Sequence, residues 1–473
     1  MISKKKVVIL GAGIAGLSAG YFLSRSEKYE VVVIEKEPVA GGLCGSFKHD
    51  GFVLDYGAHK LYSLIPGIMD VFEEIMGKSL LKLPKRNRIF LKGQLLDYPL
   101  KMSNMAKVFG PVLVFQLGFG YIPALIKGLF KRDDTVSYED YIVKRFGRPT
   151  YELVFEPLAD KVWGGPSTLH PEIAKARIPA SGGLEVILKL LGIKKETSQT
   201  NAEFFYYPRE GFGAFPNTLR DRIKEMGGKI LVNTKICRIE RFETKIKSVI
   251  VDYKDETLSL PCDYLVSSIP LPDLGNLVFS DNDSGFHNAI NGLQYRHLIL
   301  VYIFVNRPIV LEDQWIFFPE RNLIFSRIFE QKQMNPELGP EGHTAICCDF
   351  TTSEDGWQWS ATNDELAEDS IKGLVEGGFI KSDEVRGYLV KRVKNFYPRY
   401  DLLYEDRLKT IYNKIKSVNN LILTGRIGMY NYNNADHCLD MGCFIAEKMT
   451  NNIHPNQILD DLIEHVRSYK IVD

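Results

Sequence analysis

Three glycines follow the first apolar segment of the chain and restrict what it can fold into. Residues 6–10 read KVVIL, which is typical of a buried β-strand, and Gly11, Gly13 and Gly16 follow in G-x-G-x-x-G spacing. The first glycine permits a tight turn, the second lets the backbone approach a pyrophosphate, and the third lets a helix pack on the strand. The spacing therefore predicts a strand, a phosphate-binding turn and a helix that begins at the turn.

The next residues keep the order that a dinucleotide-binding unit requires. An apolar helical pattern runs to about Ser24, a second strand is expected at residues 29–34, and Glu35 ends that strand. An acidic side chain at this point can bond a ribose hydroxyl pair, and it repels a ribose 2′-phosphate. We therefore predict a βαβ unit that binds a dinucleotide other than NADP.

Composition limits the kinds of protein that this chain can be. It has 473 residues with 45% hydrophobic content, and its 59 Lys+Arg balance its 59 Asp+Glu. Such a length predicts two or three domains, and the zero net charge gives no basis for bulk nucleic-acid binding. The seven cysteines form no C-x-x-C pair, so we expect buried thiols, no metal site and a cytoplasmic location. The first apolar stretch runs straight into the Gly-rich turn and is interpreted as a strand, not as a cleaved signal peptide.

One uncharged segment, residues 108–126, leaves a question open. It reads VFGPVLVFQLGFGYIPALI, close to the roughly 18–20 residues of a membrane-span candidate, although its glycines and prolines disfavour a single helix. Lys127, Lys131 and Arg132 follow it and would suit a membrane surface. Two interpretations stand side by side: a buried hairpin or broken helix, and a peripheral membrane contact.

Further segments resemble a large FAD family. They are GGLCGSF (41–47), LDYGAH (54–59), ILVNTKICRIE (230–240), CDYLVSSIP (262–270) and LILTGRIGMYNYNNADHCLDMG (421–442). The chain resembles the family of amine oxidases, phytoene desaturases, protoporphyrinogen oxidases and UDP-galactopyranose mutase. The resemblance implies that FAD is the dinucleotide, with a helix N-terminus near the flavin pyrimidine that stabilises negative charge on the reduced ring.

The same resemblance implies which residues contact the cofactor. The expected cofactor-binding residues are Gly11, Gly13, Ala15, Gly16, Glu35, Lys36, Gly42, Leu43, His59, Ile236, Gly425, Arg426, Asn433, Asn434 and Asp436.

FAD segments at the start, middle and end of the chain predict interleaved domains. We expect an α/β fold with a Rossmann-like FAD-binding domain and a discontinuous α+β substrate domain. The expected bounds are 1–75, 206–275 and 405–455 for the FAD-binding domain, 76–205 and 276–404 for the substrate domain, and 456–473 for a C-terminal helix. Apolar patterns within the substrate domain predict strands at 298–305 and 344–350 and a helix at 364–377.

Five segments narrow the resemblance to proteins similar to UDP-galactopyranose mutase. They are YGAHKLYS (56–63), LLDYPLKMSN (95–104), PLADKVWGGPSTLHPEIAKARIP (157–179), LQYRHL (293–298) and FSRIFEQK (325–332). Each is short, but all five occur in the same order as in the mutases.

The mutase resemblance implies catalytic roles for a small set of residues. Arg177 and Arg327, the latter expected inside a strand at 323–329, match positions that hold a nucleotide diphosphate, which suits bidentate, permanently charged donors. His59 would position the flavin N5 or a sugar hydroxyl, or serve the structure alone. The expected catalytic residues are His59, Arg177, Arg327, Trp163, Tyr430 and Tyr432.

The function implied by the resemblance is a pyranose/furanose mutase of a nucleotide-sugar in cell-surface polysaccharide biosynthesis. N5 of the reduced flavin would be the nucleophile at the anomeric carbon, and NAD(P)H or another reductant would keep the flavin reduced. The chain departs from the mutases at Tyr62, where they carry a second histidine, and in extra length around 353–381. The sugar and the nucleotide therefore stay open, and a lipid-linked sugar phosphate fits equally well. The competing interpretation is an oxidase or desaturase of the protoporphyrinogen oxidase or amine oxidase type.

Overall fold

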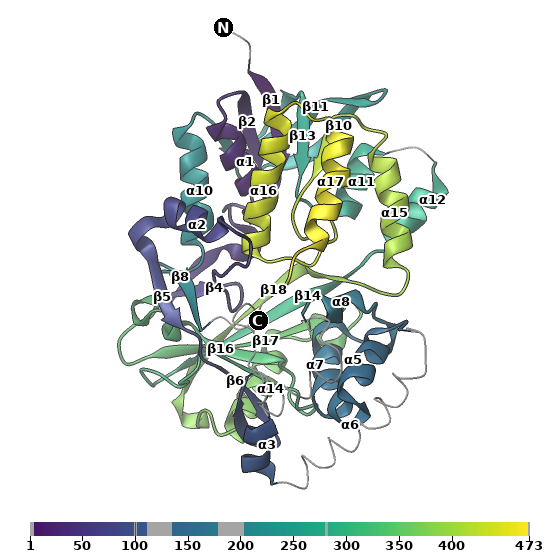
Figure 1. Ribbon diagram of the computed structural model, residues 1–473. Coiled ribbons are helices and arrows are strands. Elements are labelled where there is room, and N and C mark those ends of the chain that lie inside the picture. Colours follow the sequence, from purple (N-terminus) through teal and green to yellow (C-terminus); the bar gives the residue numbers. More distant parts are fainter. Residues whose placement is uncertain are drawn as a thin grey trace.

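The protein folds into two halves, each built around a β-sheet, as the predicted α/β class requires (Figure 1). The computed structural model describes residues 4–98, 100, 102–110, 135–177, 203–279 and 282–471. The first described residues lie at the top of the upper half, and the last described residues lie between the two halves (Figure 1). The lower half holds a second, larger sheet, so the boundary between the halves runs across the middle of the molecule.

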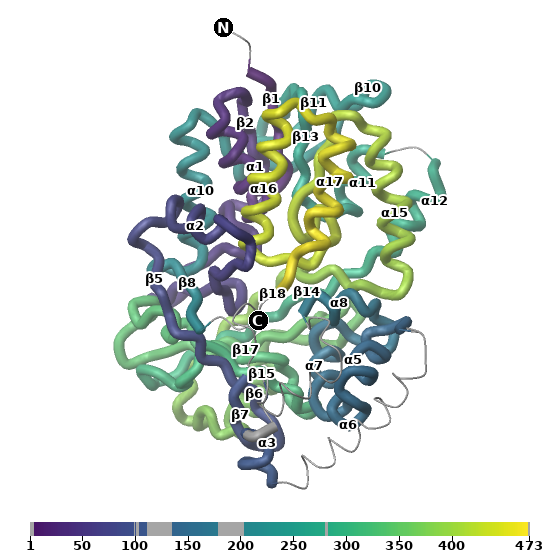
Figure 2. The backbone as a smooth tube through the Cα atoms, in the orientation of Figure 1, coloured from purple at the N-terminus to yellow at the C-terminus, as the bar shows by residue number. Residues whose placement is uncertain are grey.

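The upper half contains a five-stranded parallel sheet in the order β19-β13-β1-β2-β9. Its strands are rich in β-branched and aliphatic residues that are buried on both faces, as parallel strands require. The strand bounds are β1 (Lys5–Leu10), β2 (Tyr29–Ile34), β9 (Lys229–Leu231), β13 (Tyr264–Ser267) and β19 (Leu421–Leu423). The sheet is therefore assembled from three distant stretches of the chain, which Figure 2 shows side by side in purple, teal and yellow.

A layer of helices packs against this parallel sheet. Helix α1 packs against α10 and α16, so the start, middle and end of the chain meet again in the helical layer. The helices of this half are α1 (Ile14–Arg25), α2 (Ile68–Met76), α10 (Ala214–Glu225), α11 (Leu271–Val278), α12 (Ser284–Asn291), α15 (Tyr404–Ile415), α16 (Ala435–Thr450) and α17 (Pro455–Arg467). An antiparallel sheet of β10 (Lys235–Phe242), β11 (Lys245–Tyr253) and β12 (Glu256–Pro261) completes the half.

The lower half is built on a seven-stranded mixed sheet in the order β18-β14-β17-β16-β15-β6-β7. One face packs towards the upper half and the other forms a separate apolar core. The strands are β6 (Asn87–Leu91), β7 (Gln94–Asp97), β14 (Gln294–Val305), β15 (Trp315–Phe317), β16 (Arg327–Glu330), β17 (Thr344–Thr352) and β18 (Val385–Arg399). Two small pairs, β3 (Ser46–His49) with β4 (Phe52–Asp55) and β5 (Leu80–Pro84) with β8 (Phe204–Pro208), link the halves.

Further helices lie beside the large sheet. They are α3 (Met102–Phe109), α5 (Tyr138–Phe146), α6 (Arg148–Thr150), α7 (Glu156–Trp163), α8 (Glu172–Lys175), α13 (Trp357–Ser360) and α14 (Asn363–Glu376). The predicted strands at 298–305 and 344–350 and the helix at 364–377 are confirmed as β14, β17 and α14. The expected strand at 323–329 is wrong in its start, because the backbone bends before Arg327 and Phe318 N donates to Ser326 O at 2.9 Å.

The apolar segment 108–126 lies outside the described residues from 111 onwards. Its buried-hairpin and membrane-contact interpretations both stay predictions. Among the described residues, no helix is both long and apolar enough to cross a membrane.

Candidate active site

The turn between β1 and α1 is shaped for close contact with a phosphate. Gly11 has φ +93°, and a Cβ on Gly16 would lie 1.9 Å from Gly11 O, so both positions require glycine. A Cβ on Gly13 would meet nothing within 4 Å among the described residues, so it would point into open space. Gly13 is also the N-cap of α1 and offers no side-chain acceptor, which leaves the first amides of the helix available to an anion.

Glu35 lies at the end of β2, beside this turn. Its Oε2 accepts from Ala12 N at 2.8 Å, and its Oε1 accepts from Glu37 N at 3.0 Å. These two bonds fix the carboxylate at the cavity wall, and each oxygen retains a lone pair for a hydroxyl donor.

Two distant loops approach the same turn. Gly41 donates from its N to Ala12 O at 2.8 Å, and a Cβ on Gly42 would lie 3.2 Å from Gly13 Cα. From the end of the chain, a Cβ on Gly425, whose φ is +80°, would lie 2.5 Å from Ala15 Cβ. The backbone is therefore brought together here from three parts of the sequence, in contacts that larger residues would prevent.

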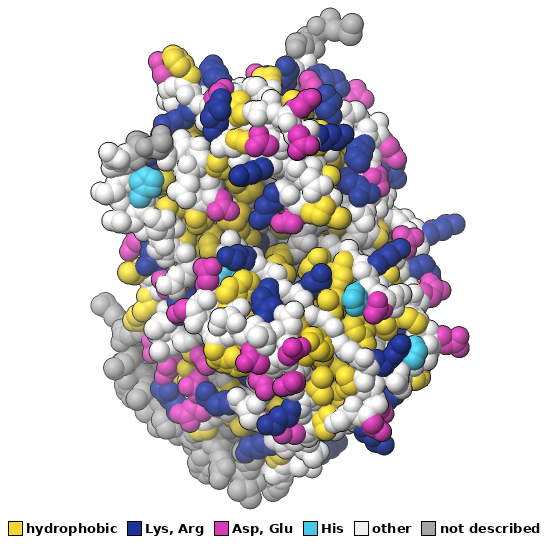
Figure 3. Space-filling view, turned by 180° about the vertical axis from the view of Figure 1, so that it is seen from behind, with side chains coloured by type: hydrophobic (Ala, Val, Ile, Leu, Met, Phe, Trp, Pro, Cys, Tyr) yellow, Lys and Arg dark blue, Asp and Glu magenta, His cyan; other side chains and the backbone are white. Residues whose placement is uncertain are grey.

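A cavity of about 1250 Å³ begins at this turn and extends between the two halves. An ordinary small-molecule site has roughly 300–1,000 Å³, so this one has room for a dinucleotide and a second ligand. Seen from behind, the recess between the halves shows hydrophobic side chains with Lys and Arg along its rims (Figure 3). The predicted residues that line the cavity are Gly11, Gly13, Ala15, Glu35, Lys36, Gly42, Leu43, His59, Arg177, Ile236, Arg327, Gly425, Arg426, Asn433 and Asn434.

The other predicted residues lie behind the wall. Gly16 packs on the turn, while Trp163 and Tyr432 contact Arg177. Tyr430 is buried, and its hydroxyl bonds to the backbone oxygens of Gln294 and Arg399 at 2.6 and 2.7 Å, which indicates a structural role.

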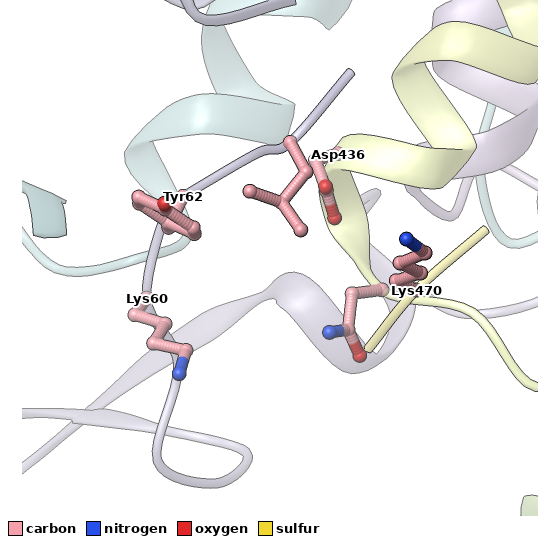
Figure 4. Close-up of a pocket in the computed structure, with 6 residues that line it drawn as sticks. Lys60, Tyr62, Asp436 and Lys470 are labelled. Carbon is pink, nitrogen blue, oxygen red and sulfur yellow. The ribbon is translucent and has the colours of Figure 1, made fainter. Parts of the chain in front are cut away.

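Asp436 lies in a second, small pocket of about 20 Å³, enough for one water molecule. In Figure 4, Lys60 and Tyr62 come from one segment, Asp436 from the start of α16, and Lys470 from the last described residues. Lys60 and Asn434 line both the small pocket and the large cavity, so the two are neighbours.

Arg177 is held flat by aromatic rings. Its guanidinium carbon lies 4.8 Å from the centre of the Trp163 ring and 4.9 Å from that of the Tyr432 ring. Its Nη2 donates to Tyr432 Oη at 2.7 Å, and the Tyr432 ring stacks on Tyr397 at 4.7 Å. Cation–π contacts and one hydrogen bond therefore fix the orientation of a permanent positive charge at the cavity wall.

Arg327 is paired with a buried carboxylate. Its Nε and Nη2 both donate to Asp349 Oδ2, at 2.8 and 2.5 Å, and Asp349 is 3% exposed. Burial raises the pKa of Asp349, while the adjacent guanidinium acts in the opposite direction. Asp349 thus orients Arg327 and offsets part of its charge.

His59 lies against the ring of Phe212, with centroids 4.6 Å apart. Burial, and then the charges of Arg327 and Arg426, lower the pKa of His59 to about 3, so the imidazole is neutral at physiological pH. Its buried Nδ1 has no hydrogen-bond partner among the described residues. A buried polar atom without a partner, on the wall of a cavity, indicates that a ligand completes the site.

Comparison with known proteins shows the family. The model of the flavin-containing amine oxidoreductases matches residues 14–426. The chain belongs to this family. Its members are FAD-binding flavoproteins, and this flavoenzyme binds FAD. The glycine cradle, the open amides of α1, the fixed Glu35 carboxylate and the unpartnered His59 nitrogen all fit that cofactor.

Individual relatives differ in the chemistry that their names state. The flavoenzyme is 24% identical to coproporphyrinogen III oxidase of Staphylococcus aureus over 281 residues, which cover 53% of this chain and 58% of that protein. It is 22% identical to 15-cis-phytoene desaturase of Synechococcus elongatus over 66% of this chain and 68% of that protein. The structure of a reduced UDP-galactopyranose mutase superposes with a TM-score of 0.84 at 17% identity, covering 99% of this chain and 98% of the mutase. That likeness shows a shared fold.

Sequence reasoning gave no role to a buried network behind the cofactor loop of the flavoenzyme. Asp55 Oδ1 accepts from Ser46 Oγ at 2.5 Å and from Phe212 N at 3.1 Å, while Oδ2 accepts from Tyr207 Oη at 2.6 Å. The network connects the loop that carries Ser46 to Phe212, which stacks on His59. Asp55 is part of the LDYGAH segment quoted for the family resemblance. Its hydrogen-bond partners are so distant in sequence that no local pattern indicates them.

Proposed function

We propose that this flavoenzyme is a mutase that interconverts the pyranose and furanose forms of a nucleotide-sugar. The observation that carries the proposal is Arg177, held flat by Trp163 and Tyr432 in the same cavity as the dinucleotide turn. A planar, permanently charged donor with a fixed orientation suits a diphosphate, which needs bidentate hydrogen bonds. Arg327 and Arg426 line the same cavity and add positive charge.

The reaction requires that the diphosphate stay close while the sugar changes its ring. The bond between the anomeric carbon and the diphosphate oxygen breaks and later re-forms, with no net change in oxidation state. When bound in its reduced form, FAD would supply a nucleophilic N5 for the anomeric carbon. Arg177 and Arg327 would hold the departed diphosphate, so that its return is effectively intramolecular. Asp349 would keep Arg327 aimed at it.

His59 would contribute as a neutral hydrogen-bonding group. Because burial and two arginines lower its pKa to about 3, it carries no proton to release as an imidazolium at physiological pH. Its free Nδ1 would bond a sugar hydroxyl or a polar edge of the flavin. Phe212 holds the ring in place by stacking.

A second candidate is an oxidase that acts on an anionic substrate. The names of two relatives favour it, because one is an oxidase and the other a desaturase. The arginines that suit a diphosphate would also bind carboxylates, and Trp315 and Phe317 add an aromatic wall to the cavity. In this case the substrate would reduce FAD, oxygen or another acceptor would reoxidise it, and no external reductant would be needed.

One experiment separates the two candidates. The FAD-loaded protein, oxidised and dithionite-reduced in parallel, is incubated with a panel of nucleotide hexopyranoses, and the products are separated by chromatography. A new peak of unchanged mass, formed only by the reduced enzyme, supports the mutase and identifies its sugar. If no nucleotide-sugar is converted by either form, and a carboxylated substrate bleaches the oxidised flavin anaerobically, the oxidase replaces the mutase.

A further inference from the structure

One face of the seven-stranded sheet packs towards the upper half, and we call it the flavin-side face. The large cavity extends beyond this face. Residues 392–397 of β18 line it consecutively, although neighbouring side chains of a strand point to opposite faces. β18 is the last strand of the sheet, and Asn395, with φ +54°, interrupts its pairing with β14. The cavity therefore wraps around an open sheet edge and reaches the opposite face.

The pairing register separates the two faces. Arg327 lies opposite Asp349, Asp349 opposite Leu300, and Leu300 opposite Lys391, so these four share the flavin-side face. Arg392 follows Lys391 directly and therefore points to the other face. Polar residues on this outer side of the edge are remote from the proposed diphosphate partners.

A cluster of polar and charged side chains lies at the outer end of the cavity. His297, Glu354, Arg392 and Lys394 all line it, and Lys394 Nζ contacts Glu354 Oε1 at 3.0 Å. The His297 ring packs on Trp359, with centroids 4.7 Å apart. Glu354 and Trp359 lie in the segment that connects β17 to α14.

Two of these side chains have donor capacity that the described protein leaves unused. The Nε of Arg392 is buried and has no hydrogen-bond partner among the described residues, while its Nη1 and Nη2 bond to Asn363 Oδ1 and Ala361 O. His297 Nδ1 accepts from Asn395 N at 3.0 Å, and burial lowers the pKa of the ring. The neutral ring therefore carries its proton on Nε2, which leaves that N–H as a second donor.

We propose that His297, Arg392 and Lys394 form an outer subsite that binds a phosphate group of an elongated substrate. The inference extends the proposed function, because it describes the substrate that enters the same cavity. Three N–H donors, two of them charged, suit the oxygens of a phosphate. Glu354 orients the Lys394 ammonium and reduces the net charge of the subsite, so it tunes the affinity. The substrate then has anionic groups at two places, one at Arg177 and one beyond the sheet edge.

The subsite can be tested with inorganic phosphate and the FAD-loaded protein. Calorimetric titration is carried out in an Arg177→Gln background, which weakens phosphate binding on the flavin side. We expect Lys394→Gln to raise the dissociation constant of phosphate about tenfold, the equivalent of one charge-assisted hydrogen bond. We expect Glu354→Gln to lower it severalfold, because it removes a competing carboxylate. Lys391→Gln, on the same strand but the opposite face, is the matched control and leaves the constant unchanged.

The results of the phosphate titrations do not depend on whether the protein catalyses the proposed mutase reaction. If phosphate does not bind, if the constant does not respond to Lys394→Gln and Glu354→Gln, or if Lys391→Gln has the same effect as Lys394→Gln, the outer subsite is refuted. Thermal melting of each variant shows whether it is folded, and the opposite signs expected for Lys394 and Glu354 cannot result from general destabilisation. Failure of the mutase assay with normal phosphate titrations would refute the proposed reaction and leave the subsite standing.

Discussion

Tyr432 Oη accepts a hydrogen bond from Arg177 Nη2 at 2.7 Å, across 255 positions of the chain. The tyrosine comes from the loop before α16, and the arginine follows α8 in the other half of the molecule. The bond thus joins the cofactor side of the cavity to the expected substrate side. It also fixes the guanidinium that carries the proposed function.

Removal of the Tyr432 hydroxyl tests whether this hydrogen bond helps Arg177 to bind its ligand. Tyr432→Phe keeps the ring under Arg177 but loses the acceptor, which is worth about 1 kcal/mol, or roughly fivefold in affinity. We expect weaker binding of a nucleotide diphosphate by this factor, with unchanged FAD content. Calorimetry and the flavin absorbance of the purified protein measure the two quantities. An unchanged affinity would show that Arg177 does not contact the ligand.

The glycine turn offers a matched pair of substitutions. Gly16→Ala places a Cβ 1.9 Å from Gly11 O, so we expect a destabilised protein that retains little FAD. Gly13→Ala directs its Cβ into open space, so the apoprotein should lose less than about 1 kcal/mol while FAD binding weakens strongly. Thermal melting of the apoproteins and FAD titration distinguish the two effects. Equal FAD affinity of Gly13→Ala and the parent would place the pyrophosphate elsewhere.

Acid stability depends on His59. The pKa of His59 is lowered from 6.5 to about 3 in the folded protein by burial and by Arg327 and Arg426. Below pH 6.5 the unfolded chain binds a proton that the folded chain does not, so stability falls as the pH decreases from 6.5 towards 3. The slope from this group is at most about 1.4 kcal/mol per pH unit.

His59→Asn removes this contribution, because the amide does not titrate. We expect the loss of unfolding free energy between about pH 7.5 and about pH 5 to be smaller in the variant than in the parent. Urea unfolding at both pH values, with and without saturating FAD, provides the comparison. Identical losses in the two proteins would mean that His59 is accessible to protons in the folded state.

We expect substitution of Asp55 to lower the free energy of unfolding more than substitution of an ordinary surface carboxylate does. Asp55→Ala leaves Phe212 N, Ser46 Oγ and Tyr207 Oη without their shared acceptor, at a cost of about 3 kcal/mol. Asp55→Asn retains one carbonyl oxygen and should cost less. Chemical unfolding measures both variants, and FAD fluorescence reports whether the cofactor loop has moved. Equal stabilities for the two variants would contradict the proposed importance of the shared oxygen.

Local patterns in the sequence predicted the first two strands of the upper half. The strand expected at residues 29–34 is β2 with the same bounds, because glycine spacing and β-branched runs act over a few residues. In the large sheet, the predicted strand ends differ from the observed ones. β14 begins at Gln294, because pairing with β18 extends it beyond the apolar run. Arg327 starts its strand rather than lying inside it, because the preceding residues bend around Phe318.

Long-range partners could not be obtained from the sequence alone. The resemblance indicated Arg177 and Tyr432 separately, but not that they touch, and it implied a catalytic role for Tyr430 without indicating that its hydroxyl bonds to backbone oxygens. Asp55 and Tyr207 are 152 positions apart. The outer end of the cavity depends on β18 being the last strand, which is a property of the sheet and not of any local motif.

The strand order of the parallel sheet has a consequence for biosynthesis. β19, at Leu421–Leu423, is the edge strand that pairs with β13, and α16, which packs on α1, ends only at Thr450. A ribosome that has made the first three hundred or so residues has therefore produced the glycine turn without the loop of Gly425 and Arg426 that closes over it. Domains usually fold as units during synthesis. We therefore expect the first strands to stay unassembled until nearly the whole polypeptide has emerged, and FAD to bind stably only at the end of synthesis.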